Sequence, residues 1–392
     1  MAATGTSSLG DGLVSVAFPL LAVTLTRDPL LIAGVAIAGR LPWLLISLPA
    51  GALADRMDRR RLVAVVETTR AIVLLGLGVT IAFGQATLVM LYGAAFVVGA
   101  LETAFAAATR AIIPSLVRDA QVPRANGYLL AAETTAEQFA GPGVGGLLFA
   151  WAPAVPFLAD AASFAGSAAL LTRALPGSAI QSDSSSTTLM EDVRASLRWL
   201  RGQPALRVLA LIVSTFAFCQ AMVLSVLVLY GLRVLGLSKT GYGLFLSVAA
   251  IGDVLGSILA HRIHASIGAA RTVAAAGIAA ACGYLMLAST TTIAIGALGC
   301  TLEAFAVALG NVATLSLRHK LIPTELFGRV NNAFRTCVFG VVVVGALAGG
   351  VLTTRIGIRS TFLLAGGVQL LLTALLTQRL AAEIVRSPAR RS

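Results

Sequence analysis

Long uncharged apolar segments follow one another along nearly the whole chain. Two of them, 71–101 and 272–302, are long enough to cross a membrane more than once, because one spanning helix takes about 20 apolar residues. Each contains a polar break, at Gly84-Gln85 and at 289–292, so each predicts two spans joined outside the hydrocarbon. The other uncharged segments are 208–232, 336–354 and 360–378.

The residue pattern within these segments indicates helices rather than the strands of a membrane barrel. Barrel strands are about 10 residues long and alternate apolar with polar side chains. The segments of this chain are apolar all round and rich in leucine, alanine and valine. We therefore expect an all-α membrane protein with twelve spanning helices, over 7–27, 30–54, 62–83, 86–109, 124–150, 155–173, 205–232, 240–262, 271–288, 292–316, 327–353 and 358–380.

The middle of the chain differs from the spans on either side. Residues 181–188 form a polar tract rich in serine and threonine, which is typical of a flexible linker. In the following segment, 189–200, leucine and valine recur at helical spacing with arginines between them, which predicts a short amphipathic helix on the membrane surface. We expect a six-helix bundle over 1–173, a cytoplasmic linker over 174–204, and a second six-helix bundle with a short tail over 205–392.

The two halves carry similar residues in the same order and at a nearly constant offset. One such match can arise by chance, but four in one order indicate a duplication. Parallel repeats of six helices, with a substrate site near the midplane between them, are a transporter architecture. The matched positions are Leu53-Ala54-Asp55-Arg56 with Leu259-Ala260-His261-Arg262, Leu101-Glu102 with Leu302-Glu303, Arg124-Ala125-Asn126 with Arg329-Val330-Asn331, and Gly145 with Gly350.

Composition and charge agree with a membrane location. The chain is 57% hydrophobic and 12% charged, whereas soluble domains carry about 25% charged residues. With both termini in the cytoplasm, 21 of the 29 lysines and arginines fall on the inner side and five on the outer side. This predicts a multi-pass protein of the cell inner (plasma) membrane whose arginines face anionic lipid headgroups. Nucleic-acid binding, which a net charge of +12 suggests in a soluble protein, is the weaker interpretation.

The turn after the second predicted span carries a motif that resembles the loop signature of the major facilitator superfamily. The resemblance implies the fold of that superfamily, with Asp55 at the C-terminal end of a helix, where the helix dipole disfavours a negative charge. In the family, this aspartate contacts the N-terminal end of helix 11 and closes the inner gate. A basic cluster that only sets the topology would explain the arginines but not Gly51 and Asp55. The inner-gate residues are Gly51, Asp55, Arg56, Asp58, Arg59 and Arg60, followed by Arg61.

Finer features resemble one bacterial branch of that superfamily, which contains enterobactin exporters and macrolide-efflux proteins. They extend over nearly the whole chain, and they imply export without identifying a substrate. The features are Leu9-Gly10-Asp11 with Ala17-Phe18-Pro19-Leu20-Leu21, Ala111-Ile112-Ile113-Pro114-Ser115-Leu116-Val117, Gly141-Pro142 with Gly145-Gly146, and Asp160-Ala161 with Ser163-Phe164.

The segment from Gly141 to Gly146 also resembles the helix 5 motif of exporters that exchange substrate for protons. Gly141 and Gly145 are four residues apart, which lets a neighbouring helix approach closely, and Pro142 bends the helix. The sequence departs from the family pattern at Glu137, where the motif often has glycine. The resemblance implies a proton-coupled antiporter.

Charged residues inside the predicted spans are the main candidates for chemistry. An ionised side chain at the centre of a spanning helix costs about 2.5–3.5 kcal/mol, so such residues pair, line a hydrated cavity, or exchange protons. Helices 1, 4, 7 and 10 line the cavity in the family, which makes Asp11, Glu102 and Glu303 the proton-coupling candidates. The alternative is that these acids are hydrogen-bonded or ion-paired groups that hold helices together.

Other charges are expected to face the cavity or to pair. Arg40 and Arg335 are candidate counterions for the acids, or partners for an anionic substrate. Glu67 and Arg70, three residues apart, are expected to form a structural pair. The remaining cavity charges are Glu133, Glu137 and Asp253.

The sequence therefore predicts a secondary active transporter, a proton-coupled exporter of small amphipathic or hydrophobic molecules of drug, macrolide or siderophore type. An importer on the same fold, or a membrane sensor or scaffold, is the alternative. No H-E-x-x-H, C-x-x-C or ATP-binding G-x-x-x-x-G-K-[ST] motif occurs, so an enzyme or an ATP-driven pump is not expected. We expect a monomer in contact with lipid, protons and a small-molecule substrate, with no cofactor, metal or nucleic acid.

Overall fold

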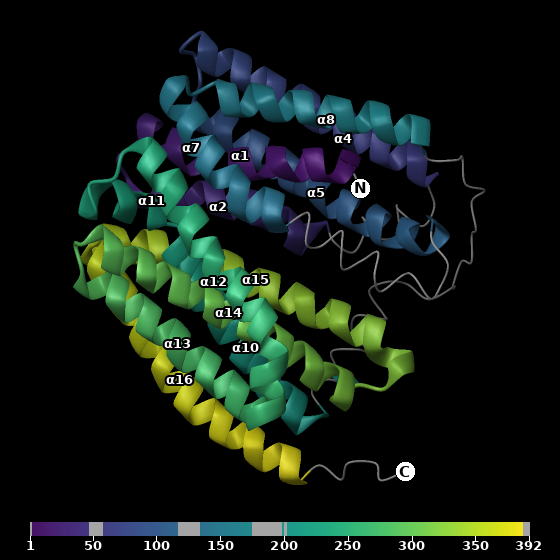
Figure 1. Cartoon of the computed structure of the whole chain (residues 1–392), viewed down its shortest axis with the longest axis vertical. Coiled ribbons are helices and arrows are strands. Elements are labelled where there is room, and N and C mark those ends of the chain that lie inside the picture. Colours follow the sequence, from purple (N-terminus) through teal and green to yellow (C-terminus); the bar gives the residue numbers. More distant parts are fainter. Residues whose placement is uncertain (1, 47–57, 117–133, 175–197, 200–201, 387–392) are drawn as a thin grey trace. The chain divides into compact units, whose positions relative to one another are not determined.

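The computed structural model describes residues 2–46, 58–116, 134–174, 198–199 and 202–386 (Figure 1). Every regular element within these residues is a helix. Nine of these helices are long and apolar enough to cross a membrane, and two further apolar helices are shorter. The prediction of an all-α membrane protein is confirmed.

The helices of the first half follow the predicted spans closely. Most boundaries agree within a few residues, although the first helix begins five residues earlier than predicted. Predicted residues 47–54 and 124–133 lie outside the described part, as does most of the expected amphipathic helix over 189–200. The elements are α1 (Ala2–Leu25), α2 (Pro29–Leu45), α4 (Arg59–Ala82), α5 (Leu88–Leu116), the π-helix η2 (Thr135–Ala140), α7 (Gly141–Trp151) and α8 (Val155–Ala174).

The first span of the second half is not continuous, contrary to the prediction. The sequence predicts a single helix over 205–232, but α10 ends at Leu224. Ser225 donates through its hydroxyl to the carbonyl of Met222, and the backbone leaves the helical conformation at Val226, with φ −123° and ψ 6°. The elements are α10 (Pro204–Leu224), α11 (Leu227–Leu229), the π-helix η3 (Tyr230–Val234), α12 (Lys239–Ile267), α13 (Ala269–Ser289), α14 (Ile293–Leu321), α15 (Thr324–Ile356) and α16 (Ile358–Arg386).

The chain divides into two compact units. The first comprises residues 1–185 together with 231–247, and the second comprises 186–230 together with 248–392. In the first unit α8 packs against α1 and α4, and α5 packs against α2 and α4. In the second, α10 packs against α15 and α16, and α13 packs against α14 and α16.

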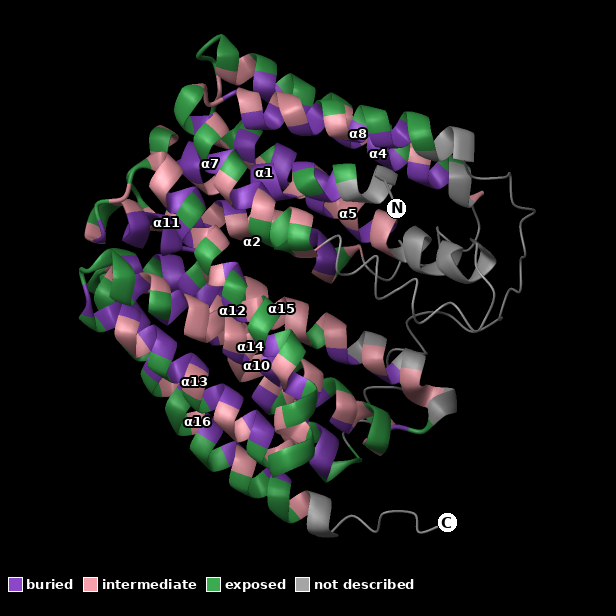
Figure 2. Ribbon diagram, viewed as in Figure 1, coloured by how far each residue is buried: buried purple, intermediate pink, exposed green. Residues whose placement is uncertain are grey.

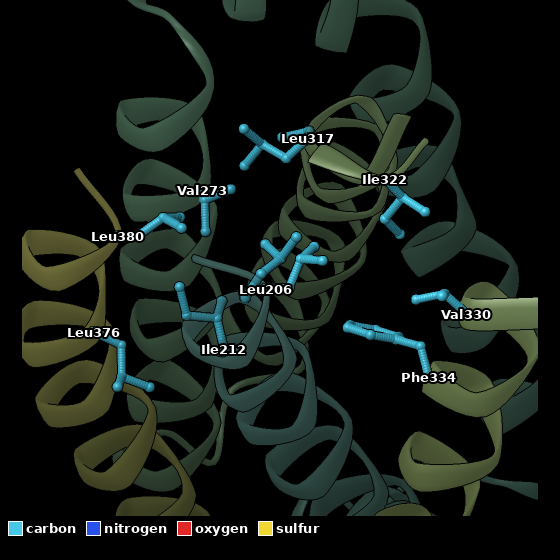
Figure 3. Close-up of a cluster of buried hydrophobic side chains, with 11 residues drawn as sticks. Leu206, Ile212, Val273, Leu317, Ile322, Val330, Phe334, Leu376 and Leu380 are labelled. Carbon is cyan, nitrogen blue, oxygen red and sulfur yellow. The ribbon is translucent and has the colours of Figure 1, made fainter. Parts of the chain in front are cut away.

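The second unit contains a continuous apolar core at one end of its helices. Figure 3 shows Leu206 and Ile212 of α10 together with side chains from four other helices. Each of these side chains is less than 10% exposed, so they pack against one another where the helices meet. The other members are Leu209, Val273, Ala313, Leu317, Ile322, Val330, Phe334, Leu376 and Leu380.

Opposite faces of single helices differ in burial (Figure 2). Many of the exposed side chains are large and apolar. On α16, Phe362 and Leu380 are fully buried, whereas Leu363 and Leu371 are 57% and 60% exposed. A soluble protein rarely exposes such a continuous apolar surface. These side chains are placed to face lipid.

Glycine lets several of these helices approach within contact of each other's backbones. A Cβ atom at Gly345 of α15 would lie 2.5 Å from the carbonyl oxygen of Phe218 on α10. On α12, a Cβ atom at Gly256 would lie 2.5 Å from the carbonyl oxygen of Phe305 on α14. Small residues at helix contacts are typical of membrane proteins, because lipid offers helices no hydrophobic drive to associate.

We expect Gly345→Ala to lower the stability of the protein in detergent by about 1–3 kcal/mol, because the added methyl group must push α15 away from α10. The matched control is Gly367→Ala on α16, where a Cβ atom would meet nothing within 4 Å. Replacing a glycine inside a helix by alanine where there is space stabilises by about 0.5–1 kcal/mol. Thermal unfolding of the two variants in the same detergent compares them, and equal melting temperatures would contradict the close contact.

Candidate functional site

The candidate residues of the inner gate lie only partly in the described chain. Gly51, Asp55 and Arg56 fall outside it. Asp58 lies just before α4, and its carboxylate accepts a hydrogen bond from the backbone N–H of Arg61 at 3.3 Å. Arg59 and Arg60 form the first turn of α4. The gate assignment therefore stays a prediction.

Glu303 lies in the middle of α14 and is held by side chains from two other helices. Its Oε1 atom accepts a hydrogen bond from Nε2 of Gln220 on α10 at 3.1 Å. The same oxygen accepts a second hydrogen bond from the hydroxyl of Tyr284 on α13 at 3.2 Å. Both donors are neutral, so they orient the carboxyl group without cancelling its charge.

The surroundings of Glu303 are tightly packed. A Cβ atom at Gly283 of α13 would lie 3.2 Å from the Cβ atom of Glu303, so the absence of a side chain there admits α14 at this depth. Asp253 of α12, one of the predicted cavity charges, is half-buried and interacts electrostatically with Glu303. In the described part of the chain, no lysine, arginine or histidine forms an ion pair with Glu303.

Glu102, the repeat-related partner of Glu303, has different surroundings. It is half-buried on α5, and no hydrogen bond to its carboxyl group is found among the described residues. The duplication therefore places a carboxyl group in both halves but does not reproduce its hydrogen bonds.

Asp11, the third proton-coupling candidate, lies near three buried ionisable residues of the same unit. It is half-buried on α1 and interacts electrostatically with Glu67 of α4 and Asp160 of α8. Arg70, one turn after Glu67, interacts electrostatically with both of these acids. Sequence reasoning missed Asp160 as a functional candidate, although it is the sole acidic residue in the predicted span 155–173.

The remaining predicted cavity charges differ in burial. Arg40 of α2 and Glu137 of η2 are exposed, and Glu133 lies outside the described residues. Arg335 of α15 is half-buried, with its guanidinium carbon 5.7 Å from the centroid of the Phe339 ring.

The glycine-proline motif of helix 5 begins directly after a π-helical turn. Pro142 has no N–H to donate to a residue four positions earlier, and its ring would clash with that carbonyl group in a regular helix. The N–H of Gly141 instead reaches the carbonyl group of Ala136, five residues earlier, in the wider η2 turn. A turn of this kind relieves the clash while the chain remains helical.

The motif presents glycines to two neighbouring helices. A Cβ atom at Gly145 would lie 2.6 Å from the carbonyl oxygen of Leu13 on α1. A Cβ atom at Gly146 would lie 3.0 Å from the Cα atom of Gly243, in the part of α12 that belongs to the first unit. Substitution by any larger residue at either glycine requires a backbone shift.

Comparisons with solved structures identify the fold. The chain matches a variant of the nucleoside transporter NupG with a TM-score of 0.80 at 13% identity, over 96% of this chain and 99% of that one. It matches a bacterial homologue of the human lysosomal transporter Spinster with a TM-score of 0.75 at 14% identity, over 99% and 95%. A bacterial homologue of the iron transporter ferroportin matches with a TM-score of 0.71 at 16% identity, over 97% of each chain. At such identities the likeness shows the fold alone, which is that of major facilitator transporters.

The comparison of sequences identifies the family. No curated protein sequence matches the chain. The profile of the family described as transmembrane secretion effector matches residues 1–390, which is nearly the whole sequence. The chain therefore belongs to the transmembrane secretion effector family and is a membrane transporter of the major facilitator superfamily.

Proposed function

We propose that this transporter is a proton-coupled exporter of small amphipathic or hydrophobic molecules, of drug, macrolide or siderophore type. Export is supported by the family's description as a secretion effector and by the resemblance of Gly141-Pro142 and Gly145-Gly146 to the exporter motif. The resemblance to the branch with enterobactin exporters and macrolide-efflux proteins supports the substrate class. The protein works as a monomer in a bacterial plasma membrane.

The observation that carries the proton-coupling proposal is the carboxyl group of Glu303. An acid inside a membrane span persists when it is paired with a cation, lines a hydrated route, or takes up a proton. Gln220 and Tyr284 are its hydrogen-bond partners, and neither carries a charge. Protonation is therefore the step that neutralises Glu303, and binding of substrate or a change of state expels the proton.

The chain orientation and the domain boundaries complete the proposal. Both termini lie in the cytoplasm, because this orientation places 21 basic residues on the inner side and five on the outer side. The halves are 1–173 and 205–392, joined by the cytoplasmic linker 174–204. Asp55 closes the inner gate in the outward-facing state, and Gly51, Arg56, Asp58, Arg59 and Arg60 are the other residues assigned to this gate.

We expect Glu303→Gln to abolish proton-driven export while leaving substrate exchange intact. The glutamine keeps the shape and accepts the hydrogen bonds of Gln220 and Tyr284 but cannot exchange a proton. The measurement is transport of ethidium and of erythromycin in proteoliposomes under an imposed pH gradient. We expect the rate to fall by about tenfold or more, which corresponds to roughly 1.4 kcal/mol, whereas counterflow without a gradient stays near the wild-type rate.

The control variant is Asp28→Asn, an exposed acid at the N-terminus of α2, which should transport at the wild-type rate. The triple variant Asp11→Asn, Glu102→Gln and Glu303→Gln tests all three coupling candidates together. If it transported with normal pH dependence, proton coupling through these acids would be refuted. Uptake into vesicles in the import direction alone would favour the importer, and no transport of any probe would favour a sensor or scaffold.

We expect Asp55→Asn to slow transport by about tenfold or more, which corresponds to roughly 1.4 kcal/mol in the activation free energy of transport, without reducing membrane insertion. The change removes the negative charge that the gate contact needs but preserves the size of the side chain. Transport of the same probes is measured alongside the amount of protein in the membrane fraction. A wild-type transport rate at equal protein level would contradict the assignment of Asp55 to the inner gate.

A further inference from the structure

Three charged side chains are buried in the described part of the chain, and all three lie on two adjacent helices. Glu67 and Arg70 of α4 are 0% and 1% exposed, and Asp160 of α8 is 0% exposed. Asp11 of α1 adds a half-buried carboxyl group that interacts electrostatically with Glu67 and Asp160. We call these four residues the α4–α8 charge cluster.

The local packing is built to hold the cluster together. The helices α4 and α8 lie side by side (Figure 1), and α1 packs against α8. Gly10 of α1 leaves space for Asp160, because a Cβ atom at that position would collide with its Oδ1 atom and would lie 2.8 Å from its Cγ atom. The hydroxyl of Ser163 donates a hydrogen bond to Oδ1 of Asp160 at 2.9 Å.

Aromatic rings surround the one positive charge of the cluster. The guanidinium carbon of Arg70 lies 5.0 Å from the centroid of the Phe164 ring and 5.5 Å from that of Phe105. Cation–π contacts at these distances stabilise a buried arginine in its charged form. Of the elements packed around the cluster, α5 presents Phe105 and carries the half-buried Glu102, whereas α7 carries no titratable side chain.

Several polar atoms of the cluster lack a hydrogen-bond partner in the described structure. Both carboxylate oxygens of Glu67, Oδ2 of Asp160, and Nε and Nη2 of Arg70 are buried without one. Buried polar groups are normally hydrogen-bonded, and the exceptions point to water, an ion or a proton. Donors and acceptors are both unpaired, which favours bound water over a metal ion, because water can serve each kind of atom.

The charges of the cluster do not balance. The two buried carboxyl groups of Glu67 and Asp160 share one buried guanidinium group, that of Arg70, so full ionisation of these three residues would leave one uncompensated negative charge among them. Glu67 is three residues from Arg70 on the same helix face and is its nearest counterion along the chain. Asp160 interacts electrostatically with Asp11, Glu67 and Arg70, but no basic residue lies within one turn of it on its own helix.

The second half of the chain supplies an internal comparison. The third and sixth helices of that half, α13 and α16, pack against each other as α4 and α8 do. The polar side chains buried there are neutral: Thr272 on α13, and Thr361, Gln369 and Thr373 on α16. The same helix pair therefore packs without charge, so packing alone does not explain the charges between α4 and α8.

We propose that the α4–α8 charge cluster is a hydrated proton-binding site in which Asp160 holds a proton at neutral pH and Glu67 stays ionised as the counterion of Arg70. The bound proton is released at alkaline pH, and water links the unpaired atoms of Glu67, Asp160 and Arg70. This site lies in the first unit and is separate from Glu303 in the second. The inference does not rest on the direction of transport or on the role of Glu303.

The test is infrared spectroscopy of the whole protein in lipid nanodiscs, at pH values from mildly acidic to alkaline. Protonated carboxyl groups give a C=O stretching band that carboxylates do not give. We expect Asp160→Asn to remove one band that the wild type shows at neutral pH and loses at alkaline pH. Glu303→Gln should leave that band in place, which separates this site from the proposed coupling site, and Asp28→Asn is the control for an exposed acid.

Arg70→Gln tests the assigned pair. Without the guanidinium group Glu67 loses its counterion, so one additional protonated-carboxyl band is expected, and the double variant Glu67→Gln with Arg70→Gln should return to the wild-type pattern. If Arg70→Gln does not fold, the double variant still carries the test, because it removes both charges and must retain the Asp160 band. The proposal is overturned if the wild type and Asp160→Asn give the same spectra, if the band persists at all pH values, or if sodium ions alone remove it.

Discussion

Hydrocarbon provides neither water for polar groups nor a hydrophobic drive for helices to associate, and the architecture of this transporter follows from that constraint. Backbone polar groups are satisfied within helices, and helices are held together by close contact at glycine. The same glycines determine where charged side chains are tolerated. Gly283 allows α13 to approach α14 beside Glu303, and Gly10 leaves the space that Asp160 occupies. The glycines that allow the helices to pack closely therefore also make room for the acidic side chains.

The two halves resemble each other in packing and differ in charge. Gly141 and Gly145 approach α1, and Gly345 and Gly349 approach α10, with the same offset of 204 residues in both cases. The repeat match of Gly145 with Gly350, made from the sequence, is therefore shifted by one residue from the position that makes the equivalent contact. Packing tolerates little change because a side chain at these glycines would overlap a neighbouring backbone. A buried charged side chain needs only a counterion, a hydrogen-bond partner or a proton. The two halves can therefore carry buried charges at different positions.

The sequence predicted the elements well because hydrophobic length is a property of single segments. It failed at Ser225-Val226, where neither glycine nor proline marks the interruption and the backbone leaves the helical conformation at Val226. Glu303 was identified because a charge stands out in an apolar segment. Its partners Gln220 and Tyr284 were not, since they come from other helices and meet Glu303 only through the packing of α10 and α13 against α14.

The position of Asp160 beside Glu67 and Arg70 could not be predicted from the sequence. Within its own segment it matched a family motif, and Glu67 with Arg70 formed a balanced pair that needed no further explanation. Only the packing of α8 against α4 adds a third buried charge and breaks that balance. The threonines and the glutamine that are buried on α13 and α16 are neutral, which shows that this helix pair can pack without a buried carboxyl or guanidinium group. This helix pair can pack with neutral buried groups, so burying three charged groups at α4 and α8 costs free energy that packing does not require. Proton binding is the function that we propose for these charged groups. Because the cluster lies within one unit, its protonation depends on packing among α1, α4, α5 and α8, whereas that of Glu303 depends on α10, α13 and α14.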